Sequence, residues 1–157
     1  MVEFCGWDMP VQYNSFDVKE SHIHTRTEAS LFDVSHMGQL RYPTYFLPKN
    51  MHSHTNIIHS ITGKDRVAFL EQLVVADVAG LPLHQARLSV FTNEQGGIKD
   101  DTMITNAGDY LYVVVNAGCA EKDIAHLLAH QATFRAKGKD VNVQVIQDHS
   151  LIALQGE

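Results

Sequence analysis

Apolar and polar positions follow one another along the chain in patterns that predict both strands and helices. Residues 88–92, 98–105 and 110–115 are strand-like runs. Two short polar turns, residues 93–97 and 106–109, separate them and are rich in residues that accept a positive φ. Connections this short join antiparallel neighbours, so the pattern predicts a three-stranded antiparallel meander.

Helical periodicity lies on both sides of this predicted meander. After Thr62 and Gly63, apolar side chains recur at helical spacing, at Val67, Leu70, Leu73 and Val74. A second helix is predicted over residues 121–132, with one face made by Ile124, Leu127, Leu128 and Gln131. A polar helix over residues 21–30 and strands over residues 141–145 and 150–154 complete the pattern. The fold class is therefore α+β, with helices packed on a mostly antiparallel sheet.

Two segments differ from this pattern. Residues 2–13 are rich in aromatic and apolar side chains and indicate a folded piece with a turn around Pro10. Residues 41–60 hold two prolines, three aromatics and three histidines, with neither helical nor strand periodicity. Unstructured loops of that length are uncommon inside compact domains. We therefore expect an atypical insert at about residues 41–60 that bulges as a disordered loop.

Composition narrows the possible classes of partner and compartment. Hydrophobic residues make up 45% of the 157 residues, so a packed core is expected. The formal charge is −6, so nucleic acid is not a predicted partner. No apolar stretch approaches the roughly 18 to 20 residues of a membrane span. Two distant cysteines, Cys5 and Cys119, indicate a reducing compartment. Residues 1–13 do not have the composition of a targeting leader.

The segment from Gly96 to Asp101 (GGIKDD) is the most informative candidate for chemistry. The two glycines permit a tight turn and a close approach to a ligand. Asp100 and Asp101 are adjacent in a predicted strand and must point to opposite faces, so one of them heads toward the interior. A carboxylate there is costly unless it has a partner or a task. Alternatively, both acids simply cap the hairpin turn.

The strand over residues 110–115 ends in Asn116-Ala117-Gly118, which places an amide side chain at the strand's end. That arrangement suits recognition of a flat heterocycle with donors and acceptors on its edge. The alternative is that Asn116 caps the helix that follows.

Other polar clusters favour a structural role. Asp33, Ser35 and His36 are close in sequence, as in a hydrolase triad, but no nucleophile-elbow motif accompanies them. We therefore interpret Asp33 and His36 as structural groups and Met37 as a residue that lines a pocket. Two His-x-His pairs, at residues 22–24 and 52–54, lack a third ligand at convincing spacing. No metal is therefore predicted.

In their order along the chain, these segments resemble the T-proteins of the glycine cleavage system, the aminomethyltransferases. The resemblance rests on GWDMPVQY (residues 6–13), SLFDVSHM (residues 30–37), LSVFTNE (residues 88–94), GGI through Asp101, YVV through Cys119 with the following EKD, and residues 151–156. It covers nearly the whole chain except the atypical segment, and its combined specificity is high. The chain is thus identified as the amino-terminal part, residues 1–157, of a T-protein folate-binding region.

The resemblance implies a tetrahydrofolate-dependent transferase of glycine catabolism and one-carbon metabolism. Such an enzyme takes an aminomethyl group from the lipoylated H-protein, passes the carbon to tetrahydrofolate and releases ammonia, without a metal. The motif implies that Asp101 lies beside the reacting folate nitrogens and is the catalytic residue. The residues that the resemblance assigns to the pterin are Met37, Leu88, Tyr112 and Asn116, with Asn116 hydrogen-bonding the ring.

Two departures from the family pattern bear on activity. Family members run to more than twice this length, and further folate contacts lie in the part that would follow Glu157. The segment of residues 41–60 has no counterpart and has the look of translated intron, which favours a eukaryotic gene and a mitochondrial-matrix parent protein, or the cytoplasm if the source is bacterial. A non-catalytic folate-binding module and an inert splice or gene-model fragment therefore stay open as alternatives.

Overall fold

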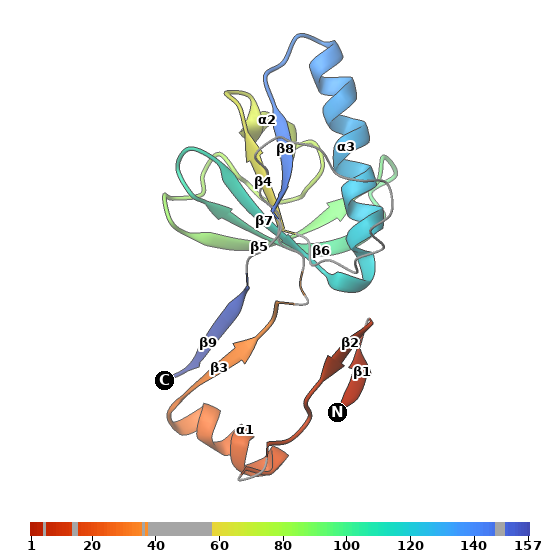
Figure 1. Cartoon of the computed structure of the whole chain (residues 1–157). Helices are drawn as coiled ribbons and strands as arrows, with labels where there is room; N and C mark the ends of the chain where they lie inside the picture. The colour runs from red at the N-terminus through yellow and green to blue at the C-terminus, as the bar shows by residue number, and fades with distance from the viewer. Residues whose placement is uncertain (5, 14–15, 36, 38–57, 147–149) are drawn as a thin grey trace. The chain divides into compact units, whose positions relative to one another are not determined.

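The computed structural model describes the chain except residues 5, 14–15, 36, 38–57 and 147–149 (Figure 1). The chain divides into two compact units. The smaller unit, unit 1, contains Met1–His36 and Ser150–Glu157, and the larger unit, unit 2, contains Met37–His149.

Unit 2 is built on a five-stranded antiparallel sheet, which confirms the predicted α+β class. Its strands, in spatial order, are β5 (Ala86–Thr92), β6 (Ile98–Asn106), β7 (Leu111–Val115), β4 (Ile58–Thr62) and β8 (Asn142–Ile146). The predicted meander is confirmed as β5, β6 and β7, and its turns carry Gly96 at φ 77° and Gly108 at φ 87°. β4 lies between β7 and β8 in the sheet. Its first three residues, 58–60, belong to the segment that the sequence analysis expected to be an insert. Residues 41–57 are outside the described residues, so the insert stays a prediction there.

The helix α3 (Ala120–Ala136) lies beside the sheet and covers one of its faces (Figure 1). It follows a short 3-10 turn, Ala117–Cys119, and is longer than the predicted helix of residues 121–132. Leu127 is fully buried, but Leu128 is 40% exposed, so its predicted place on the inner face is wrong. The inner stripe contains Ala120, Asp123, Leu127 and Phe134, at spacings of three, four and seven residues.

The helix predicted after Gly63 is shorter than its apolar pattern suggests. α2 spans only Arg66–Leu70, although Leu73 and Val74 are buried as predicted. The backbone of this segment pairs with the end of β5 instead of continuing the helix. The carbonyl of Leu73 accepts from the amide of Thr92, and Val74 forms an isolated bridge with Phe91. Long-range pairing therefore overrides local periodicity.

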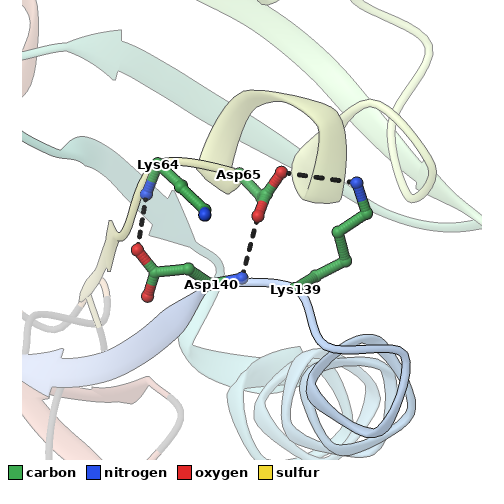
Figure 2. A network of polar contacts seen from close by, with 4 residues as sticks. All are labelled: Lys64, Asp65, Lys139 and Asp140. Carbon is green, nitrogen blue, oxygen red and sulfur yellow. Dashed lines mark hydrogen bonds and ion pairs between the residues drawn. The ribbon is translucent and has the colours of Figure 1, made fainter.

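A reciprocal contact ties the start of α2 to the loop before β8 (Figure 2). The amide of Asp65 donates to the carbonyl of Asp140 at 3.0 Å, and the amide of Asp140 donates to Oδ2 of Asp65 at 2.8 Å. The amide of Lys64 donates to Oδ2 of Asp140 at 3.0 Å, and Lys139 pairs with Oδ1 of Asp65 at 3.6 Å. The Asp140 amide, followed by the charge of Lys139, lowers the pKa of Asp65.

Unit 1 contains two small sheets and a helix. Its elements are β1 (Val2–Phe4), β2 (Trp7–Met9), α1 (Val18–Thr27), β3 (Ala29–Asp33) and β9 (Ile152–Gly156). β1 and β2 form a hairpin around Gly6, so the predicted turn at Pro10 is misplaced. β9 corresponds to the strand predicted over residues 150–154 and pairs antiparallel with β3. α1 begins three residues before the predicted helix, because Asp17 and Glu20 form a capping box.

Candidate functional site

Three of the five predicted site residues project from the same face of the large sheet. Leu88 on β5 pairs with Met103 on β6, and Met103 pairs with Val114 on β7. Asp101 stands two residues before Met103, and Tyr112 two residues before Val114. Side chains two residues apart in a strand share a face, so Leu88, Asp101 and Tyr112 share this one. We call it the open face.

The opposite face is the one that α3 covers. Phe91 contacts His126 of α3 edge to face, with ring centroids 6.3 Å apart. Side chains on this covered face are buried, as expected for a core: Ser89, Phe91, Thr102, Ile104, Val113 and Val115. On the open face, by contrast, Leu88 is 65% exposed and Asp101 is exposed. An exposed apolar side chain beside an exposed carboxylate suits a ligand surface better than a core.

The two adjacent acids point to opposite faces, as the strand argument predicted. Asp101 pairs with Val90 and is exposed on the open face. Asp100 pairs with Phe91 and is half-buried on the covered face. The alternative that both acids only cap the hairpin is wrong, because Asn93 supplies the turn's side-chain acceptor, receiving the amides of Gln95 and Gly97 at 3.0 and 2.7 Å.

Asn116 joins these two carboxylates. Its Nδ2 donates to Oδ1 of Asp101 at 2.8 Å and lies 3.2 Å from both carboxylate oxygens of Asp100. Its backbone amide also donates to Asp100, at 3.4 Å. The side chain makes no capping hydrogen bond, and Cys119 holds the cap position of α3. The helix-cap alternative for this side chain is therefore wrong.

A buried acid that the sequence argument did not single out lies behind Asp100. Asp123, in the first turn of α3, is 0% exposed, and burial followed by the neighbouring Asp100 raises its pKa to about 7. A signal for it exists in the sequence: Asp123 stands three residues after Ala120 and four before Leu127, on the helix's inner stripe. An acid at such a position requires a partner.

The remaining predicted positions differ in how far the structure describes them. Burial followed by nearby Tyr110 raises the pKa of Tyr112, which is half-buried. Met37 is half-buried, and its neighbours at 36 and 38 lie outside the described residues, so its role stays a prediction. Asp33 accepts the Ser35 amide at 3.0 Å, and Ser35 Oγ accepts the Leu151 amide at 3.0 Å. These contacts support the structural interpretation of that cluster.

Two cavities bear on where a ligand could bind. One of about 160 Å³ opens on the open face, where Ser60 pairs with Tyr112, and is lined by Ser60, Thr62, Tyr110, Gln144 and Ile146. A larger one, of about 950 Å³, lies in unit 1 between α1 and β9, and none of the five predicted site residues lines it. We therefore place the candidate site on the open face of the sheet.

Lys99, His126 and His130 form a cluster on the side of the sheet that α3 covers. Lys99 lies 3.0 Å from Nδ1 of His126, and the rings of His126 and His130 are 4.5 Å apart between centroids. Burial, then the charges of Lys99 and His130, lower the pKa of His126 to about 4. This histidine is therefore neutral at neutral pH and serves as a packing group.

The described residues show neither a cluster suited to a metal ion nor a helix suited to a membrane span. Those residues contain no group of three or more His, Cys, Asp or Glu side chains arranged to hold a metal ion. None of the described helices is both long enough and apolar enough to cross a membrane. His22 and His24 lie on α1, and residues 52–54 are outside the described part of the chain.

Comparisons with known proteins give one consistent result. The mitochondrial aminomethyltransferase of Dictyostelium discoideum is 55% identical over 158 residues, covering 99% of this chain and 34% of that protein. Those of Flaveria trinervia and Canis lupus familiaris are 49% and 45% identical, with the same coverage. The crystal structure of the glycine cleavage system aminomethyltransferase T from Bartonella henselae matches with a TM-score of 0.75 at 33% identity, covering 99% of this chain and 36% of that one.

The chain thus spans about a third of the length of the curated relatives it matches. The family model of the GCVT N-terminal domain matches residues 52–157, which include the whole sheet of unit 2 and β9. The resemblance seen in the sequence is confirmed at the level of the family. The chain belongs to the GCVT N-terminal domain family.

Proposed function

We propose that this chain is the folate-binding part of an aminomethyltransferase of the glycine cleavage system. The whole protein would take the aminomethyl group from the lipoylated H-protein, pass its carbon to tetrahydrofolate and release ammonia. The relatives named above are aminomethyltransferases, and the resemblance in the sequence implies the same substrates. The observation that carries the proposal is the open face, where Asn116 holds an exposed Asp101 on the same face of the sheet as Leu88 and Tyr112.

Each residue has a chemical role in this proposal. Leu88 and Tyr112, together with Met37, offer apolar and flat surfaces to the pterin. Asn116 uses its Nδ2 to hold the two carboxylates, so the group it offers to the ring is the amide oxygen, which accepts from ring N–H groups. An exposed position on β6, which pairs with a strand on each side, makes Asp101 accessible to a bound substrate.

Asp101 acts on the substrate through charge and orientation. Its carboxylate accepts hydrogen bonds from folate N–H groups and stabilises positive charge that develops on nitrogen as the one-carbon unit is transferred. The nucleophile is an amine, so a strong base is not needed. Positioning is the main contribution expected of Asp101, because correct placement lowers the entropic part of the barrier.

Calorimetric titration of the 157-residue chain with tetrahydrofolate tests the proposed site. The Asp101→Asn variant should bind about tenfold or more weakly, because a charge-assisted hydrogen bond contributes about 1.5–3 kcal/mol. Asp109→Asn is the matched control, since it removes the same charge from an exposed turn outside the open face. Equal affinity for Asp101→Asn and the control would refute the role of Asp101.

A second candidate function is folate binding without turnover. The open face accounts for binding of a folate, and the chain spans about a third of the length of its curated relatives. Single-turnover transfer from aminomethyl-loaded H-protein separates the candidates. Transfer by this chain supports the enzyme, and binding without transfer supports the module. The absence of both identifies an inert fragment.

We further propose that the protein acts in the mitochondrial matrix, because the relatives are named as mitochondrial proteins. Fractionation of the source cells, with an antibody against this chain, tests the location. Recovery in the matrix fraction is the expected result. If the source is bacterial, the expected location is the cytoplasm.

A further inference from the structure

Asp123 is fully enclosed between α3 and the covered face of the sheet. It is the one ionisable residue among the buried polar side chains that the structure describes, the others being Ser60, Ser89 and Thr102. Neither of its carboxylate oxygens accepts a hydrogen bond from a described donor. A charged carboxylate in that situation is strongly disfavoured, since it has lost its water without gaining a donor.

Asp100 also points to the covered face, and its carboxyl acts on Asp123 as a hydrogen-bonding neighbour and as a charge, both of which raise the pKa of Asp123. Two carboxyl groups form a hydrogen bond only when one of them carries a proton. Asp100 is only half-buried and already accepts from Asn116, through Nδ2 at 3.2 Å and the backbone amide at 3.4 Å. Asp123 is the fully enclosed member of the pair and has no donor of its own, so the proton belongs on Asp123, whose O–H donates to Asp100.

The other charged groups facing Asp123 do not replace this contact. Lys122, its neighbour on α3, donates to the carbonyl of Lys99 at 2.6 Å and to Sγ of Cys119 at 3.4 Å. Lys99, on β6, directs its own ammonium to His126. Both lysines act on Asp123 only through space and lower its pKa, but burial and Asp100 outweigh them and hold it at about 7.

With the proton on Asp123, hydrogen bonds run from the core to the open face: from Asp123 to Asp100, and from Asn116 to both Asp100 and Asp101. We propose that Asp123 is a positioning residue, which fixes Asp100 by a donated hydrogen bond and thereby orients the Asn116 amide and the Asp101 carboxylate. The inference rests on the proposed function in one respect, namely that Asp101 contacts the substrate. The orientation itself is a property of the chain without ligand.

The proposal makes Asp101 sensitive to a proton on the other face of the sheet. When Asp123 loses that proton, two carboxylates face each other in the core and repel. Asp100 then moves or draws the Asn116 amide toward itself, and the 2.8 Å contact from Asn116 to Asp101 weakens. Tetrahydrofolate affinity should accordingly fall severalfold as pH rises through about 7.

Nuclear magnetic resonance of the 157-residue chain, between pH 5.5 and 8.5, tests the orientation directly. In the wild-type chain the Asn116 side-chain NH₂ and the Asp101 Cγ resonances should titrate together near pH 7. Asp123→Asn keeps a donor toward Asp100 and cannot ionise, so both titrations should disappear. Glu121→Gln, an exposed acid in the same helical turn, is the matched control and should leave them unchanged.

A transmission control places Asn116 in the pathway. In Asn116→Leu the Asp101 resonance should no longer follow the Asp123 titration. Flat Asn116 resonances in the wild-type chain, or a titration that persists in Asp123→Asn, would overturn the proposal. Because Asp123→Asn is nearly isosteric, the test does not depend on a variant that leaves a cavity.

The tetrahydrofolate titrations, run over the same pH range, separate this inference from the proposed function. Wild-type affinity should depend on pH, and that of Asp123→Asn should be flat and close to the wild-type value at low pH. If tetrahydrofolate fails to bind any variant while the resonances titrate as expected, the proposed function fails and the orienting role of Asp123 stands. If it binds with pH-independent affinity in the wild-type chain, the role of Asp123 in substrate binding is refuted.

Discussion

The Nδ2 atom of Asn116 lies 2.8 Å from Oδ1 of Asp101 and also donates a hydrogen bond to the Asp100 carboxylate on the other face of the sheet. This geometry is possible because Asn116 lies directly after the last residue of β7, so its side chain is not confined to one face of the sheet. One amide thus couples an exposed carboxylate to a half-buried one. The orientation of Asp101 depends on a neutral donor rather than on a cation.

Replacement of Asn116 tests this coupling. Asn116→Leu removes the donor at similar volume, and it should cost about 1–3 kcal/mol in the free energy of unfolding because the half-buried Asp100 loses a partner. Asn116→Asp places a third carboxylate between two others and should destabilise more at pH 8 than at pH 5. Chemical denaturation at both pH values measures the difference. Equal losses at both pH values for Asn116→Asp would contradict the electrostatic part of the argument.

The local sequence pattern was sufficient to predict the meander and the opposite orientations of Asp100 and Asp101, since β-strand alternation is a property of neighbouring residues. It was not sufficient to find the network behind Asp101. Asp123 is 22 residues from Asp101 in sequence, and their connection depends on α3 packing on the covered face. The error at Leu128 has the same origin, because the sheet determines which stripe of the helix is buried.

The stripe itself can be tested with adjacent leucines. Leu127→Ala should destabilise unit 2 by about 2–5 kcal/mol, because Leu127 is fully buried and the substitution leaves a cavity. Leu128→Ala removes the same atoms from a side chain that is 40% exposed and should cost less than about 1 kcal/mol. Urea denaturation followed by circular dichroism gives both values. Similar losses for the two variants would mean that α3 packs differently.

His126 should make folding sensitive to acid. Its pKa in the folded chain is about 4, lowered first by burial and then by Lys99 and His130, whereas an unfolded chain has the ordinary value of about 6.5. Between pH 4 and pH 6.5, His126 is therefore protonated in the unfolded chain and neutral in the folded chain. The stability that neutral His126 contributes is therefore complete above pH 6.5 and is lost as pH falls toward 4.

His126→Gln measures this contribution, because glutamine retains an acceptor for Lys99 and does not titrate. The melting temperature of the variant relative to wild type should rise as pH falls from 6.5 to 4. Asp123 contributes a change of opposite sign, since its raised pKa favours the folded chain at low pH, but it is present in both proteins and cancels in the difference. A difference that does not vary with pH would refute the assignment.

The loop contact of Asp65 and Asp140 shows a second limit of local prediction. These residues are far apart in sequence, yet each donates its backbone amide to the other. Figure 2 shows the hydrogen bond from the Asp140 amide to the Asp65 carboxylate. The sequence marks Gly63 only as the start of a predicted helix. The mutual fit of the two loops depends on β4 and β8 being neighbours in the sheet, which no short segment encodes.

Gly63→Ala tests how closely these two loops approach. Gly63 has a φ of 99°, and an added Cβ would lie 2.8 Å from the Asp140 carbonyl carbon and 2.9 Å from Cα of Val141. Backbone atoms cannot yield as a flexible side chain does, so the loops must separate and the Asp65–Asp140 hydrogen bonds must lengthen. Gly138→Ala is the matched control, because Gly138 has a φ of 74° and nothing within 4 Å of its added Cβ. The control should cost about 1 kcal/mol from backbone strain alone, and Gly63→Ala should cost clearly more. Thermal unfolding of both variants decides the matter, and equal losses would show that the loops do not constrain each other.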